Sequence, residues 1–151
     1  MVYSTSDFIF KTVPEQLVIT SKWKGKPQGT GNQLNKLLLC SSLYSSGNAF
    51  NMFFADDEDQ LSHVETCVPV RKKFKSNYEF RTIPEKRCIS YFHKGPYTTL
   101  TDAYAAIFRY IDENRLKVEM PAREVYLISP GLLVKGNPDK YLTEILIPLA
   151  D

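Results

Sequence analysis

Residues 12–25, "TVPEQLVITSKWKG", and residues 82–95, "TIPEKRCISYFHKG", are two copies of one stretch of sequence. At one constant offset, which carries Thr12 onto Thr82, the residues Thr, Pro, Glu, Lys and Gly recur in the same places. Several identities at one spacing, with similar residues between them, indicate an internal repeat. We expect each copy to be the opening strand of one half of a duplicated fold, with Lys-Gly marking the end of that strand.

A helix is predicted after each opening strand. In the second half, apolar residues recur every three or four positions, which is typical of one buried helix face. These residues are Leu100, Ala103, Tyr104, Ile107, Phe108 and Ile111. Thr99 and Asp102 have the pattern of a capping box at the start of this helix. The same offset predicts a weaker copy of the helix around residues 34–38.

Two strand-like runs follow each helix, at residues 49–55 and 62–70 in the first half and at 123–129 and 141–149 in the second. The last runs also match, at a slightly larger offset, because E-T-C-V-P-V begins at Glu65 and E-I-L-I-P-L begins at Glu144. Each half therefore has the order β-α-β-β, which places the chain in the α+β class.

We expect a single domain over residues 1–151, with repeat 1 at about residues 8–70, a charged linker at 71–79 and repeat 2 at about 80–150. Neither half can bury both its sheet and its helix alone. Two halves related by a pseudo-twofold axis would share one antiparallel sheet platform and leave a ligand cleft where they meet.

Composition limits the class of function. A formal net charge of +2 gives no broad basic face for nucleic acid, and no apolar run approaches the ~20 residues that span a membrane. The amino terminus lacks the basic and apolar regions of a signal peptide. The three cysteines form no C-x-x-C pair, which argues against a zinc ribbon and fits a reducing compartment. We expect a cytoplasmic protein that binds neither nucleic acid directly nor a membrane.

Three segments carry a resemblance to a known family: "HKGPYTTLTDAYAAIFRYI" at 93–111, "PAREVYLI" at 121–128 and "YLTEILIPL" at 141–149. Together they resemble the GyrI-like small-molecule-binding domain, which also forms the effector-binding part of AraC-type and MerR-type regulators. The resemblance implies a cleft between the repeats that holds bulky, often cationic, organic ligands against aromatic side chains and a buried glutamate. The repeat begins within about a dozen residues of the amino terminus, so we expect a standalone member without a DNA-binding domain.

Glu144 is the first candidate for the ligand site. Strand alternation puts Leu142, Glu144 and Leu146 on one face, and a carboxylate among leucines needs a partner or a proton. In a cleft it would pair with a cationic ligand; the alternative is an exposed glutamate paired with Lys or Arg. Tyr126 is expected to hydrogen-bond the ligand or Glu144, the alternative being a core tyrosine.

Three further residues complete the predicted ligand site. Trp23 and His93 occupy equivalent positions of the repeat, and Tyr91 shares a strand face with His93. Trp23 and Tyr91 would form aromatic walls for a cation. His93 is also a candidate as a catalytic base or haem ligand, but a weaker one, because a histidine at a strand end is usually a satisfied or solvated side chain. Packing in the core is the alternative for Trp23.

Neither a metal nor a cofactor is expected. His63, Glu65 and Cys67 alternate along one strand, but adjacent side chains on a flat strand rarely converge on one ion. No P-loop, dinucleotide fingerprint or G-x-S-x-G motif is present.

The preferred function is binding of a hydrophobic, cationic or aromatic small molecule, in sensing, sequestration or detoxification. One alternative, implied by the resemblance, is a hydrolase of cyclopropane-containing natural products, with Glu144 activating water and Tyr126 bonding the substrate. A second is a modulator of a partner protein such as DNA gyrase. The sequence leaves these alternatives, and the presence of enzymatic activity, open.

Overall fold

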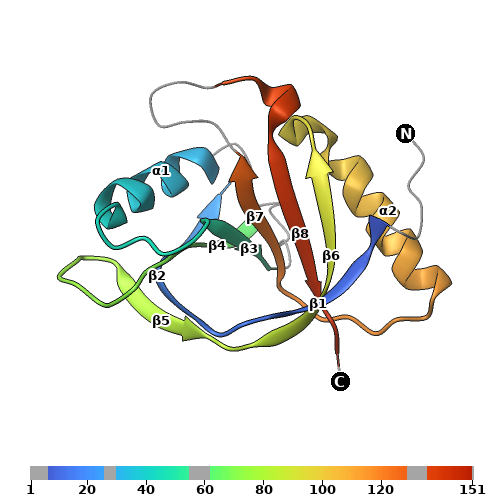
Figure 1. Ribbon diagram of the computed structural model, residues 1–151, viewed down its shortest axis with the longest axis horizontal. Coiled ribbons are helices and arrows are strands. Elements are labelled where there is room, and N and C mark those ends of the chain that lie inside the picture. Colours follow the sequence, from blue (N-terminus) through green and yellow to red (C-terminus); the bar gives the residue numbers. More distant parts are fainter. Residues whose placement is uncertain (1–6, 26–29, 55–61, 129–135, 151) are drawn as a thin grey trace.

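The computed structural model describes residues 7–25, 30–54, 62–128 and 136–150 (Figure 1). Its elements are, in order, β1 (Ile9–Val13), β2 (Gln16–Gly25), α1 (Thr30–Ser41), β3 (Phe50–Phe53), β4 (Ser62–Pro69), β5 (Glu79–Ile83), β6 (Lys86–Lys94), η3 (Tyr97–Thr99), α2 (Leu100–Glu113), β7 (Ala122–Ile128), η4 (Pro138–Lys140) and β8 (Leu142–Pro148). All eight strands join one antiparallel sheet in the order β1-β6-β8-β7-β3-β4-β2-β5. The predicted α+β fold of two similar halves is confirmed.

The opening strand of each half is bent into two strands. The bend follows Val13 in the first half and Ile83 in the second, where Pro-Glu separates β1 from β2 and β5 from β6. Proline has no N–H to donate to a ladder, so pairing stops there. The two bent strands pair with each other on both sides of the bend, Ile9 with Ser90 and Gln16 with Ile83. The sheet therefore curls back on itself (Figure 1).

The strand registers repeat the internal symmetry of the sequence. Val18 pairs with Pro69 in the first half, and Cys88 pairs with Pro148 in the second. Val18 and Cys88 are equivalent positions of the repeat, and so are the two prolines. Strands β3 and β7 join the halves at the centre. The expected pseudo-twofold relation thus extends through the whole sheet.

The curled sheet carries buried apolar residues on both of its faces. Its helix face packs against α2 through Ile89, Ile145 and Ile147 and against α1 through Ile19 and Val68. Its inner face, enclosed by the curl, carries two smaller apolar clusters. These clusters comprise Val18, Phe50, Met52, Cys67 and Ile83, and Val13, Cys88 and Leu146.

Helix α2 buries most of the predicted face, including Ala103 and Ile107, although Phe108 is exposed. The predicted capping box is wrong, because the Thr99 side chain makes no cap hydrogen bond. Its hydroxyl instead donates to the Pro96 carbonyl at 2.8 Å, within the turn that precedes the helix. No helix in the described part of the chain is long and apolar enough to cross a membrane.

Candidate functional site

A buried carboxylate lies on the helix face, between a tyrosine of α2 and the apolar cluster that packs against α1. Glu124, on β7, is 9% exposed. The Tyr104 hydroxyl, from α2, donates to one carboxylate oxygen at 2.6 Å, and the Tyr126 hydroxyl donates to the other at 3.0 Å. Tyr126 itself packs in the cluster of Leu34 and Leu37 from α1. Within the described residues, no lysine or arginine forms an ion pair with Glu124.

The electrostatics of this carboxylate follow from its burial. Desolvation raises the pKa of Glu124 above its ordinary value, although the hydrogen bonds from Tyr104 and Tyr126 oppose the shift. Burial and the neighbouring carboxylate likewise raise the pKa of both tyrosines, so they remain neutral donors. A buried carboxylate whose partners are neutral favours a cation that enters its surroundings.

Four tyrosines lie at this carboxylate or in contact with its partners, and we call Tyr97, Tyr104, Tyr126 and Tyr141 the tyrosine cluster. The Tyr97 ring meets the Tyr126 ring edge-on at 5.8 Å between centroids and lies 5.2 Å from the Tyr141 ring. Tyr97 is 37% exposed, whereas Tyr126 and Tyr141 are buried. The cluster therefore runs from the surface, at the turn before α2, inward to Glu124.

A chain of hydrogen bonds fixes Tyr126 from the other side. Trp23 Nε1 donates to Thr66 Oγ1 at 2.8 Å, and Thr66 donates to Asn51 Oδ1 at 2.6 Å. Asn51 Nδ2 donates to the Tyr126 hydroxyl at 3.0 Å. Because that hydroxyl oxygen accepts from Asn51, its own proton is directed to Glu124. Trp23 is thus connected to the site through this chain.

Glu144 lies on the opposite face of the sheet from Tyr126. The register places Val125, rather than Tyr126, opposite Glu144, and alternation then separates the two side chains. Lys11 Nζ and Ser90 Oγ each donate to Glu144 at 2.6 Å. The predicted grouping of Tyr126 with Glu144 is therefore wrong, since the tyrosine donates to Glu124 instead.

Tyr91 and His93 lie on the helix face beneath α2. Tyr91 belongs to the α2 core, and its ring centroid is 5.4 Å from that of Phe8. His93 is buried, with Nε2 2.8 Å from Thr99 Oγ1. Both therefore have local packing partners, and their roles in ligand binding, like those of Trp23 and Tyr126, remain predictions.

Glu124 is a candidate site residue that the sequence prediction misses, although the E-x-Y motif contains it. Strand parity already places Glu124 beside Tyr126, with one residue between them. The sequence favours Glu144 because leucines flank it, yet flanking apolar residues do not reveal which charged side chains a sheet brings alongside.

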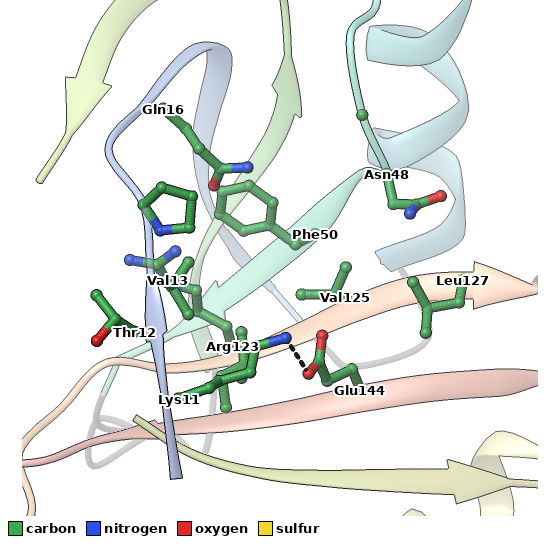
Figure 2. A pocket seen from close by; sticks show the side chains of 13 residues that line it. Lys11, Thr12, Val13, Gln16, Asn48, Phe50, Arg123, Val125, Leu127 and Glu144 are labelled. Atoms are coloured by element: carbon green, nitrogen blue, oxygen red, sulfur yellow. Dashed lines mark hydrogen bonds and ion pairs between the residues drawn. The ribbon is translucent and has the colours of Figure 1, made fainter. Parts of the chain in front are cut away.

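Glu144 borders a pocket of about 330 Å³ on the inner face, which we call the inner pocket (Figure 2). Its walls come from the first bent strand and from β3, β7 and β8. Charged and apolar side chains both line it, among them Lys11, Val13, Phe50, Arg123, Val125, Glu144 and Leu146.

The residues considered as metal ligands are engaged otherwise. Arg81 holds the buried Glu65 carboxylate through two hydrogen bonds, of 2.7 and 2.6 Å, and Thr20 donates a third at 2.6 Å. His63 is exposed. Across the described ranges, no group of three His, Cys, Asp or Glu side chains is placed to hold a metal ion.

A curled antiparallel sheet with two helices and a buried carboxylate among tyrosines is an architecture suited to binding small organic molecules. The chain matches the family of the GyrI-like small molecule binding domain over residues 6–150, and it belongs to that family. The resemblance seen in the sequence is thereby confirmed. No curated protein sequence matches the chain.

Solved structures share the fold at low sequence identity. The C-terminal domain of EcmrR is 22% identical with a TM-score of 0.81, over 100% of this chain and 99% of that domain. This chain spans only 57% of the EcmrR chain in its DNA complex, at 21% identity and a TM-score of 0.80, with 95% of this chain covered.

Two further solved structures share the fold. SAV2435 bound to tetraphenylphosphonium is 12% identical with a TM-score of 0.64, over 95% of this chain and 93% of that one. A hydrolase from Listeria innocua is 14% identical with a TM-score of 0.69, over 95% and 92% of the two chains. At these identities the likeness shows the fold alone.

Proposed function

We propose that the chain binds a bulky hydrophobic cation at the tyrosine cluster, with Glu124 as the counter-charge. The observation that carries this proposal is a buried carboxylate whose two oxygens accept only from tyrosine hydroxyls among the described residues. A cation beside it would stabilise the ionised form that burial disfavours.

The surrounding rings suit the same ligand. Tyrosine faces attract a cation through their quadrupoles, and their area supplies most of the apolar contact. Tyr97 is the exposed member of the cluster, and its ring contacts both buried tyrosines, Tyr126 and Tyr141. We infer that the ligand enters past Tyr97 and displaces or stacks on that ring. Tetraphenylphosphonium, bound by the structural neighbour SAV2435, is a suitable probe.

The test is a titration of tetraphenylphosphonium followed by the fluorescence of Trp23, the only tryptophan. We expect Glu124→Gln to weaken binding by roughly tenfold or more, because the counter-charge is lost while the shape is kept. Glu144→Gln is the matched control on the opposite face and should bind like the wild type. Equal binding by Glu124→Gln, or a loss confined to Glu144→Gln, would refute this assignment.

We further propose that such binding serves sensing, sequestration or detoxification in the cytoplasm. A hydrolase remains a second candidate, supported by the raised pKa of Glu124 and its contact with Tyr126. A carboxyl group with a raised pKa can act as a general acid or base near neutral pH. Incubation with a cyclopropane-containing alkylating compound separates the two candidates. Repeated turnover by a trace of protein indicates an enzyme, whereas protection that ends at one equivalent indicates a binder.

A further inference from the structure

The inner pocket contains a buried arginine that has no acidic partner among the described residues. Arg123, on β7, is 5% exposed and borders the pocket. Its side chain lies over the Phe50 ring, with 5.4 Å between the guanidinium carbon and the ring centroid. In the described part of the chain, no carboxylate or hydrogen-bond acceptor pairs with this side chain. A guanidinium has five N–H donors, and the Arg123 nitrogens are not among the fully enclosed side-chain atoms of the described residues, so they face the pocket and can take an acceptor there.

The carboxylate that borders the pocket, Glu144, already accepts hydrogen bonds from other side chains. Glu144 accepts from Lys11 at 2.6 Å (Figure 2). It also accepts from Ser90, at 2.6 Å. Two cationic side chains and one anionic side chain therefore border the pocket, which leaves an excess of one positive charge. Burial lowers the pKa of the Arg123 guanidinium, in keeping with an environment that lacks a compensating anion.

In the other half of the fold, the carboxylate equivalent to Glu144 is paired with an arginine instead of a lysine. Glu65, Thr20 and Arg81 stand at the repeat positions of Glu144, Ser90 and Lys11. In that trio the guanidinium binds its carboxylate with both arms, whereas Lys11 makes one contact.

The residue at the repeat position of Arg123 is apolar. Phe50 pairs with Cys67 as Arg123 pairs with Leu146, and Cys67 and Leu146 are themselves equivalent positions of the repeat. The first half therefore balances its buried charge without a second cation. Since the fold needs no arginine at this position in the first half, the extra guanidinium in the second half is available for a ligand.

We propose that the inner pocket is a second binding site, for a small organic carboxylate held by Arg123. Arginine binds carboxylates with two parallel hydrogen bonds, and a pocket of about 330 Å³ lies in the range of small-molecule sites. Val13, Val125 and Leu146 form apolar walls for the body of the ligand. Lys11, whose side chain is 40% exposed, marks the solvent side of the pocket.

The site is separate from the tyrosine cluster. Arg123 and Val125 alternate with Glu124 and Tyr126 along β7, so the two pairs face opposite sides of the sheet. A hydrophobic cation and a small carboxylate would therefore occupy the protein together.

The test is an NMR titration of the full chain with 2-naphthoate at neutral pH, with 2-naphthamide as the neutral isostere. We expect naphthoate to bind and to shift the amides of Val13 and Val125 more than that of Tyr104. Naphthamide should bind roughly tenfold more weakly or worse, and saturating tetraphenylphosphonium should not displace naphthoate. Arg123→Met should lose the same factor, whereas Arg87→Met, which removes an exposed arginine, should bind like the wild type.

Four outcomes would overturn the proposal. Three of them are no binding of naphthoate at millimolar concentration, equal binding of the carboxylate and the amide, and displacement by tetraphenylphosphonium; the fourth concerns the shift map. If Arg123→Met does not fold, the comparison of the two probes and the shift map on the wild-type chain decide the question. Shifts centred on Tyr104 rather than Val13 would place the anion on the wrong face.

Discussion

Arg81 pairs with the buried carboxylate of Glu65, and replacing Arg81 tests how one half of the fold supports the other. The Glu65 side chain is 0% exposed, whereas that of Arg81 is 38% exposed. Arg81→Met removes both guanidinium contacts and leaves Thr20 as the remaining donor. Removing one partner of a buried pair costs about 3–5 kcal/mol, and we expect about 3 kcal/mol because water can reach the Arg81 side of the pair.

The repeat supplies a matched comparison. Lys11→Met makes the equivalent change for Glu144 of the second half, but it removes a single contact beside a pocket that water can enter. We expect a loss of about 1–2 kcal/mol there, close to the value of one charged hydrogen bond. Urea unfolding at neutral pH, followed by Trp23 fluorescence and circular dichroism, measures both, with Arg87→Met as the control. Equal losses for Arg81→Met and Lys11→Met, or a loss under about 1 kcal/mol for Arg81→Met, would refute this reasoning.

The pH dependence of the same variant provides an internal check. Burial alone would raise the pKa of Glu65, but the hydrogen bonds from Arg81 and Thr20 hold it below its ordinary value of 4.5. A depressed pKa gives stability that is present above pH 4.5 and is lost as the pH falls through the folded-state value. In Arg81→Met, burial raises the pKa of Glu65 and Arg81 no longer opposes that shift. The loss in the free energy of unfolding relative to the wild type should therefore shrink on acidification. A deficit that grows below pH 4.5 would contradict the assignment.

Two further substitutions and one labelling experiment test the fold. Ile107→Ala empties a fully buried position of α2 and should lower the free energy of unfolding by about 2–5 kcal/mol in urea titrations, whereas a loss under about 1 kcal/mol would contradict its place in the core. Gly95→Ala should lower the free energy of unfolding by about 1–3 kcal/mol in the same assay, because Gly95 has φ +131°, a conformation that residues with a side chain disfavour. An unchanged urea midpoint would contradict that backbone conformation. In native protein a thiol reagent should modify the exposed Cys40 and spare the buried Cys67, whose pKa burial raises to about 12; fast reaction of Cys67, read by mass spectrometry of peptides, would contradict its burial.

The fold was largely predictable because the repeat constrains it twice. The offsets that carry Thr12 onto Thr82 and Glu65 onto Glu144 identify equivalent strands, and the same offsets relate the observed registers. The two Pro-Glu pairs mark the two bends, and proline in a strand already argues for an interrupted ladder. What the pattern could not show is that the two bent strands pair with each other and curl the sheet.

The candidate site was predictable only in part, for a physical reason. Alternation within one strand shows which residues share a face, but the neighbouring strand's register decides which residues meet across it. Lys11 and Glu144 lie far apart in the sequence, so their ion pair leaves no local signal. Glu144, which Lys11 neutralises, was therefore indistinguishable in sequence from Glu124, which accepts hydrogen bonds from tyrosine hydroxyls.

The most direct test of the central claim is the pH dependence of tetraphenylphosphonium affinity in the wild type and in Glu124→Gln. If ionised Glu124 is the counter-charge, wild-type affinity should fall as the pH drops toward and through its raised pKa, beginning above pH 4.5. Circular dichroism over the same range should show a folded protein. Glu124→Gln should bind weakly with no such dependence. Parallel pH profiles for the two proteins would contradict the account.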